Sequence, residues 1–218
     1  MRINKYIAAS SGLSRRAADA AIANGRVRVN GATPSSGQTV SKTDVVSLDG
    51  AVLSPPETST TIMLHKPVGF VVSRNGQGSQ TIYDLLPSEF RMLNPIGRLD
   101  KDSSGLLLLT NDGQLTEQLT HPRHQKLKVY QITLNKPLQP ADQQAIERGV
   151  ELEDGISRLH LTGQDTSWTV EMREGRNRQI RRTFEARGYR IVTLHRTQFG
   201  EYSLRDTPAG HIQIFTHT

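Results

Sequence analysis

A polar loop that runs directly into an all-apolar segment constrains this chain more than any other feature. Residues 97–105 are mostly polar or glycine, and they lead into four consecutive leucines at residues 106–109. Such a run is typical of a strand that is buried on both faces, and it is far shorter than the roughly 18 apolar residues of a membrane helix. Because a buried strand holds the preceding loop rigidly, we expect catalytic groups in this loop.

A proline-containing segment divides the chain into two parts. Residues 54–60 read Ser-Pro-Pro-Glu-Thr-Ser-Thr, and the two prolines stiffen the chain and remove two backbone donors. We therefore predict one domain over residues 1–58 and a second over residues 59–218. Each carries a net charge of +3, half of the total of +6, so the smaller domain is much more basic per residue. This excess favours a polyanionic partner.

The first domain is predicted to combine two short helices with a small sheet. Ile3, Tyr6 and Ile7 have the spacing of one face of a helix, and Ser14 is a suitable N-cap for a second helix over residues 14–24. The segments whose alternating side chains and flanking turns predict strands are residues 26–29 and 44–48.

The basic side chains of this domain are concentrated in its first thirty residues, where Asp19 is the single acid. They are Arg2, Lys5, Arg15, Arg16, Arg26 and Arg28. Residues 12–16, followed by residues 25–31, resemble the RNA-binding domain first seen in ribosomal small-subunit protein four, here called the S4 domain. The resemblance implies a module that grips RNA through phosphates and shape, with four candidate contacts: Lys5, Arg15, Arg16 and Arg26. The alternative is a basic helical pair without a role in RNA binding.

The second domain is predicted to be an α+β fold, in which helices flank a mixed, mainly antiparallel sheet. Its predicted strands are two within residues 62–72 around a turn at 66–69, then 106–109, 126–134, 157–161, 167–172, 191–195 and 212–215. Its predicted helices are residues 81–86, 113–120, 139–149 and 178–187.

An arginine cluster lies near the end of this domain. Residues 173–190 contain seven arginines, no lysine and two acids. The guanidinium group grips phosphate at two points and stacks on bases, and seven neighbouring cations repel one another unless an anion arrives. The cluster therefore indicates a polyanion site, and the alternative is a solvated helix face.

Four motifs of the second domain resemble those of the pseudouridine synthases: residues 65–69, 97–113, 128–130 and 174–182. With the S4-like domain in front, the chain is similar to the bacterial ribosomal RNA synthases of the small-subunit synthase A family, which also includes several large-subunit synthases. One departure is Thr183, where many relatives have methionine, and we interpret that position as a packing site.

The resemblance implies the site-specific isomerisation of uridine to pseudouridine in ribosomal RNA. Uracil leaves its ribose, turns, and rejoins it through carbon, and a carboxylate serves either as nucleophile at the sugar or as base at the neighbouring ribose carbon. It implies Asp100 as that carboxylate, and Arg181 as its catalytic partner with Arg178 as the alternative. Tyr130 would be the surface on which uracil stacks. The neighbouring Asp102 is interpreted as a loop cap.

RNA contacts in the second domain are also implied by the resemblance. Arg98 would fill the gap left by the flipped nucleotide, Arg176 and Arg178 would hold the RNA, and Leu194 would add an apolar wall. No cofactor is expected, because the reaction involves no redox change. No metal is expected either, because His121 and His124 have no obvious third ligand.

The expected partner is ribosomal RNA or an assembly intermediate of a ribosomal subunit, with no membrane involved. We expect a cytoplasmic monomer, and the absence of cysteine is compatible with a reducing compartment. Two other functions remain as alternatives: a non-catalytic RNA-binding or ribosome-assembly protein, and a synthase that acts on transfer RNA.

Overall fold

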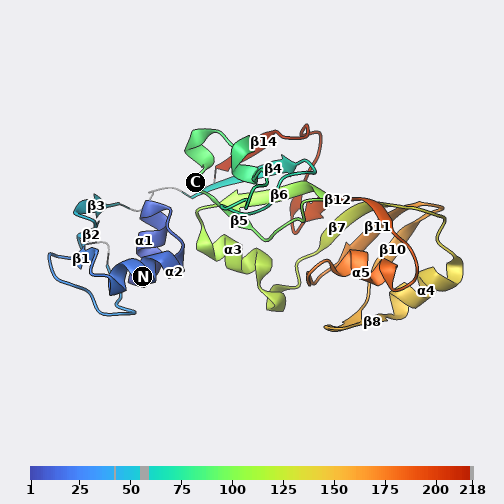
Figure 1. The fold of residues 1–218 in the computed structure, drawn as a ribbon, viewed down its shortest axis with the longest axis horizontal. Coiled ribbons are helices and arrows are strands. Elements are labelled where there is room, and N and C mark those ends of the chain that lie inside the picture. Colours follow the sequence, from blue (N-terminus) through green and yellow to red (C-terminus); the bar gives the residue numbers. More distant parts are fainter. Residues whose placement is uncertain (42, 55–58, 217–218) are drawn as a thin grey trace. The chain divides into compact units, whose positions relative to one another are not determined.

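The computed structural model describes residues 1–41, 43–54 and 59–216, which form two compact units, Met1–Ser59 and Thr60–Thr216. The elements of both units are labelled in Figure 1. Most of the proline-containing segment predicted as a linker, residues 55–58, lies outside the described residues. Across the described ranges, no helix is long and apolar enough to span a membrane.

The first unit packs two helices against a three-stranded antiparallel sheet, as the local sequence signals predict. The Ser14 hydroxyl accepts the backbone N–H of Ala17 and so caps the second helix, and Ile3, Tyr6 and Ile7 are all buried. The elements are α1 (Ile3–Ser11), α2 (Arg15–Ala23), β1 (Val27–Val29), β2 (Val46–Leu48) and β3 (Ala51–Leu53), with strand order β1-β2-β3.

The second unit is built on a nine-stranded sheet, whose main path runs β10-β11-β7-β12-β6-β4-β14. β5 and β13 pair at its margins with β6 and β12. One pairing, β12 with β6, is parallel and the others are antiparallel, so the mixed, mainly antiparallel prediction is confirmed. The strands are β4 (Thr60–Lys66), β5 (Asn94–Ile96), β6 (Ser104–Thr110), β7 (Lys128–Leu134), β10 (His160–Gln164), β11 (Ser167–Met172), β12 (Ile191–Phe199), β13 (Tyr202–Ser203) and β14 (Ile212–Thr216).

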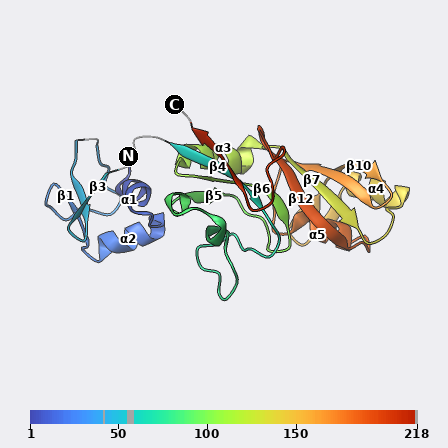
Figure 2. The same ribbon diagram turned by 90° about the horizontal axis from the view of Figure 1, so that it is seen from above.

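Helices and a separate hairpin accompany this sheet. Figure 1 shows α4, α5 and β8 on the same side of β7, β10 and β11, and the view from above in Figure 2 separates β5 and its neighbouring loops from them. The helices are α3 (Gly113–Thr120), α4 (Pro140–Arg148) and α5 (Gln179–Glu185), with 3₁₀ turns at η1 (Ile82–Leu85), η2 (Ser88–Phe90) and η3 (Pro122–His124); the hairpin is β8 (Val150–Leu152) and β9 (Gly155–Ser157).

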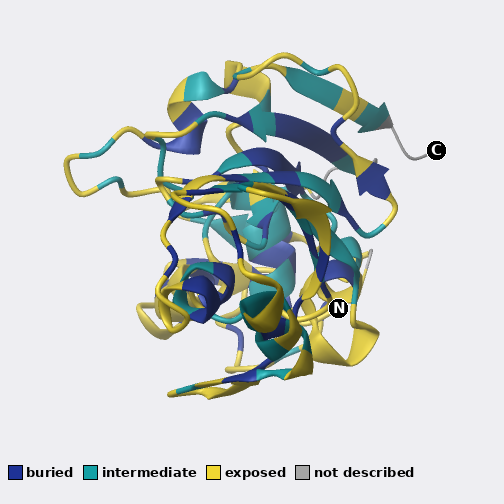
Figure 3. Ribbon diagram, turned by 90° about the vertical axis from the view of Figure 1, so that its right-hand side faces the viewer, coloured by how far each residue is buried: buried dark blue, intermediate teal, exposed yellow. Residues whose placement is uncertain are grey.

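The leucine strand β6 lies at the centre of the second unit. Leu107 and Leu109 belong to a hydrophobic cluster on one face of the sheet, whereas Leu106 and Leu108 belong to a second cluster on the other face. All four are fully buried, and Figure 3 shows the buried residues gathered along the strands. The predicted strand with two buried faces is confirmed, and it anchors the loop that precedes it.

Three predicted elements differ from the structure. Residues 70–72 do not form a strand: Val71 makes one isolated bridge to Thr81, while Phe70 and Val72 pack on the core from outside the sheet. Residues 157–161 contain the end of β9 and the start of β10, because the buried Leu159 separates two different pairings. The predicted helix over residues 81–86 is the 3₁₀ turn η1, closed by a capping box.

Gly105 allows β12 to approach the start of β6. Its φ of +110° is unfavourable for other residues, and a Cβ atom built there would lie 2.2 Å from the carbonyl oxygen of Arg196. Only glycine tolerates this combination of conformation and close contact. The parallel pairing of His195 with Ser104 and of Arg196 with Gly105 therefore brings β12 directly beside the polar loop.

Candidate active site

A cleft of about 1330 Å³ in the second unit gathers the residues that the sequence singled out there. It is lined by the loop before β6, by β7, by β12 and by the segment that leads into α5. The predicted site residues that line it are Arg98, Asp100, Tyr130, Arg176, Arg178, Arg181 and Leu194. Segments up to about a hundred residues apart in the sequence thus meet at one site.

Asp100 forms an ion pair with Arg178. Arg178 Nη1 lies 3.2 Å from Asp100 Oδ2 and also 3.2 Å from Asp102 Oδ1, and Nη2 donates to Asp102 Oδ2 at 3.3 Å. The Asp100 side chain is 35% exposed, so it remains accessible from the cleft. One guanidinium group therefore bridges two carboxylates, of which Asp100 faces a prospective substrate.

The predicted pairing of Arg181 with Asp100 is wrong, and Arg178 is the partner. Arg181 donates instead to the carbonyl oxygen of Asp102 at 2.9 Å and to that of Ile191 at 3.1 Å, and its side chain is only 12% exposed. The reason is the start of α5. Arg178 precedes the helix in a left-handed conformation and reaches Asp100, whereas Arg181 lies within the helix and binds the loop backbone.

The interpretation of Asp102 as a loop cap is also wrong. Its carboxylate accepts hydrogen bonds from Arg178, and Arg181 Nε lies 3.3 Å from Oδ2. Burial opposes ionisation of this group, but the hydrogen bond from Arg178 and the charges of Arg181 and Arg178 outweigh it and hold the pKa of Asp102 below its usual value. Asp102 thus connects both arginines to the loop.

Lys66 also holds this loop through hydrogen bonds, a role that was not predicted from the sequence. The residue is fully buried, and its Nζ donates to the carbonyl oxygens of Ser103 at 2.7 Å, Pro67 at 3.0 Å and Asp100 at 3.1 Å. Burial lowers the pKa of Lys66 to about 8, although the charges of Asp100 and Asp102 act in the opposite direction. A lysine that ends a strand whose central residues, 62–64, are apolar was the available signal.

Tyr130 and Leu194 supply the less polar part of the cleft. Tyr130 is buried in β7, directly opposite Arg196 of β12, and Leu194 is buried two residues before Arg196. Arg98 is exposed and lines the same cleft. An aromatic ring, an apolar wall and an exposed cation therefore lie around the Asp100 loop.

Arg176 has its Nη1 and Nη2 donors occupied by protein groups. It donates to carbonyl oxygens of the turn between β8 and β9 and to the Asp154 carboxylate at 2.9 Å, and its side chain is only 20% exposed. Arg182 binds the same carboxylate at 2.7 Å. The geometry therefore gives Arg176 a role in fixing the hairpin beside α5 and leaves it few donors for RNA.

The basic candidates of the first unit differ in how free they are. Arg15 and Arg16 are exposed at the start of α2, and Lys5 is half-buried on α1. Arg26 is held by Asp49, with Nε 2.8 Å from Oδ1. Its charge is therefore partly compensated, whereas the donors of Arg15 and Arg16 face solvent.

The described residues contain no group of three histidine, cysteine or acidic side chains arranged to hold a metal. His121 and His124 have ring centroids 6.2 Å apart in an edge-to-face arrangement, and Arg123 donates to the Nε2 atom of His124.

Two family models match this chain. The model described as RNA pseudouridylate synthase matches residues 60–186, and the S4 domain model matches residues 1–46. A solved structure described as a pseudouridylate synthase superimposes with a TM-score of 0.71 at 31% identity, covering 99% of this chain and 96% of the other.

Several curated proteins are similar along nearly the whole chain. Ribosomal small subunit pseudouridine synthase A of Pasteurella multocida is 35% identical, over 94% of this chain and 91% of its own length. Ribosomal large subunit pseudouridine synthase B of Bacillus subtilis is 33% identical, over 99% and 92%. The chain spans only 44% of the length of the large-subunit synthase B of Xanthomonas campestris, at 34% identity.

Proposed function

This chain belongs to the RNA pseudouridine synthase family, and from that premise we propose that it converts one specific uridine of ribosomal RNA to pseudouridine. The family makes it an RNA-modifying enzyme, and the S4 match supports RNA binding by the first unit. Relatives named for ribosomal subunits support the choice of ribosomal RNA.

One observation carries the proposal. An accessible carboxylate, Asp100, is held by Arg178 at 3.2 Å in a cleft otherwise rich in cations. Its loop is held by two hydrogen bonds from the buried Lys66, to the carbonyl oxygens of Asp100 and Ser103. A protein that only bound RNA would gain nothing from a carboxylate aimed at a polyanion, whereas the isomerisation requires one in a fixed place.

The site residues have distinct parts in this reaction. The bond between ribose C1′ and uracil N1 breaks and N1 takes up a proton, while a bond between C1′ and C5 forms and C5 gives up its hydrogen as a proton, so the overall composition is unchanged. Asp100 acts as nucleophile at C1′ or as base at the neighbouring ribose carbon, and Arg178 holds its carboxylate in place. Tyr130 offers its ring to the detached uracil, and Arg98 fills the gap in the RNA stack.

The two units have different roles in this proposal. Residues 1–58 grip the RNA through Arg15, Arg16 and Lys5, and residues 59–218 carry out the chemistry. The substrate is ribosomal RNA or an assembly intermediate of a ribosomal subunit, bound by a monomer in the cytoplasm.

The test is to map pseudouridines in ribosomal RNA from cells that lack this protein. We expect one site to disappear, to return with the wild-type gene, and to stay absent with an Asp100→Asn gene expressed at the same level. An unchanged pseudouridine map in the deletion strain would refute the proposed substrate, and restoration by Asp100→Asn would refute the proposed mechanism.

A further inference from the structure

Arg196 is a buried cation that has no acidic partner among the residues that the structure describes. Arg196 is only 2% exposed. Its Nε donates to the carbonyl oxygen of Leu106 at 2.8 Å, and its guanidinium lies 5.0 Å from the centroid of the Phe199 ring. Its Nη2 atom is buried without a hydrogen-bond partner. Burying a charge in this state is costly, and Arg196 lines the cleft.

Lys128 brings a second positive charge to the same region. It lies on β7 and lines the cleft, with Nζ 5.2 Å from the centroid of the Phe199 ring and 3.3 Å from the carbonyl oxygen of Glu174. Burial and the charge of Arg196 lower the pKa of Lys128, while Glu174 opposes that change. The two cations therefore disfavour each other.

Three neighbouring arginines of the cleft differ in this respect. Arg178 and Arg181 share the carboxylate of Asp102, and Arg176 has that of Asp154. The Glu174 carboxylate beside Lys128 is engaged by Arg176 and Gln179. Arg196 and Lys128 are thus left with backbone oxygens and one aromatic ring, and an anion from outside would complete the site.

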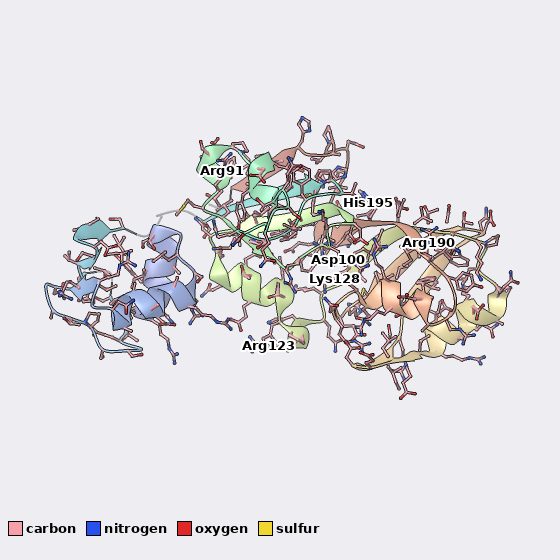
Figure 4. All side chains as sticks on the ribbon, in the orientation of Figure 1. Arg91, Asp100, Arg123, Lys128, Arg190 and His195 are labelled. Carbon is pink, nitrogen blue, oxygen red and sulfur yellow. The ribbon has the colours of Figure 1, made fainter. Side chains whose placement is uncertain are left out.

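We propose that Arg196 and Lys128 form a subsite for a phosphodiester group of the RNA next to the target nucleotide. The identity of the ligand rests on the proposed function, because RNA is the polyanion that enters this cleft. Arg196 is paired with Tyr130 across the two strands, and Lys128 precedes Tyr130 by two residues on the same strand, about 7 Å away. The subsite therefore adjoins the ring proposed to stack on uracil. Lys128 and Asp100, which line the same cleft, are labelled in Figure 4.

Binding of modified RNA tests the subsite without turnover. The full-length chain with Asp100→Asn would be titrated, by fluorescence anisotropy, with a nonanucleotide that contains one central uridine. Two further probes carry a neutral methylphosphonate at the 5′ or the 3′ linkage of that uridine. We expect one of these replacements to weaken binding about tenfold. Lys128→Gln or Arg196→Gln should weaken binding of the unmodified RNA by about as much. Each variant should also lower the slope of log affinity against log salt by about 0.7.

The decisive comparison combines both changes. In Lys128→Gln and in Arg196→Gln, the methylphosphonate should weaken binding by less than a further factor of about two, because the contact that it removes is already gone. Arg205→Gln is the matched control, since Arg205 is exposed and lies outside the cleft lining, and it should keep the full penalty. Because Arg196 is buried, a thermal melt must first show that the Arg196→Gln variant folds. If it does not fold, the half-exposed Lys128 carries the test.

The inference is overturned if both neutral linkages bind as tightly as the native one, or if the Lys128 variant keeps the full methylphosphonate penalty. Neither result depends on catalysis. A loss of the proposed function would instead appear as an unchanged pseudouridine map in the deletion strain, so the two failures are distinguishable.

Discussion

Arg178 Nη1 lies 3.2 Å from Asp100 Oδ2 and joins α5 to the loop at the start of the leucine strand. The same guanidinium holds Asp102, so a single side chain links both carboxylates of the loop to the start of α5. The side chains of Arg178 and Asp100 are 43% and 35% exposed, which leaves the pair open to a substrate in the cleft.

Asp100→Asn should abolish pseudouridine formation and leave RNA binding largely intact. The amide keeps the shape of the side chain but can neither attack the sugar nor remove a proton, so we expect turnover to fall by at least about a thousandfold. Tritium release from labelled RNA measures turnover, and a filter-binding assay measures affinity. The exposed Asp206→Asn is the control and should retain wild-type activity; turnover by Asp100→Asn at the wild-type level would contradict the mechanism.

Arg178→Gln and Arg181→Gln should have different effects. Arg178 is well exposed and touches Asp100, so its loss should lower kcat by about 10- to 100-fold with little change in stability. Arg181 is buried and donates to two carbonyl oxygens, so its loss should reduce the free energy of unfolding by about 1–3 kcal/mol. For each variant, urea unfolding measures the free energy of unfolding and single-turnover kinetics measures the rate of the reaction. A fully active Arg178→Gln enzyme would contradict the assignment of the ion pair.

Lys66 should impose an alkaline limit on activity. The pKa of Lys66 is lowered from 10.5 to about 8 by burial, so the ammonium loses its proton as pH rises through about 8. The neutral amine has two hydrogens for three carbonyl oxygens, and the grip on the Asp100 loop weakens. Stability changes in the opposite sense: between about pH 8 and 10.5 the unfolded chain binds more protons at this residue, so the contribution of Lys66 to the free energy of unfolding rises with pH.

A pH profile of kcat/KM checks the activity part of this prediction. The wild-type profile should fall above about pH 8, whereas Lys66→Met, which has no titratable group, should be less active throughout and lack that limb. Persistence of the same limb in Lys66→Met would assign it to another group.

Gly105→Ala should be strongly destabilising. The added Cβ atom would lie 2.2 Å from the Arg196 carbonyl oxygen at a φ of +110°, and we expect a loss of roughly 2–5 kcal/mol in the free energy of unfolding. Gly210→Ala is the matched control, because Gly210 also has a positive φ but open space around it, and it should cost only about 1–2 kcal/mol. Equal urea midpoints for the two variants would show that the close approach of β12 is unimportant.

Arg15→Ala combined with Arg16→Ala should weaken RNA binding and flatten its dependence on salt. Each lost phosphate contact should lower the slope of log affinity against log salt by about 0.9 for duplex RNA or 0.7 for a single strand. The control replaces two exposed arginines of the second unit, Arg148 and Arg205, outside the cleft lining. If affinity and slope are unchanged in the Arg15 and Arg16 variant, the first unit does not grip RNA as proposed.

Features that depend on neighbouring residues were predictable from the sequence. The Ser14 cap, the burial of β6 on both faces and the start of α3 at Asp112, whose carboxylate accepts the backbone N–H groups of Gln114 and Leu115, all follow from residues within one or two turns. The motif that contains Asp100 was also visible, because its polar loop and apolar strand are contiguous.

Partners of long side chains depended on the tertiary structure. Lys66 meets the carbonyl oxygens of Asp100 and Ser103 only because β4 pairs with β6, and Arg196 comes beside the loop only because Gly105 admits β12. Lysine and arginine reach several residues in any direction, so spacing along the chain cannot decide which oxygen they bind. The sequence by itself therefore determined the family of folds and the candidate carboxylate. The tertiary placement of the start of α5 beside the loop decided that Arg178 rather than Arg181 holds this carboxylate.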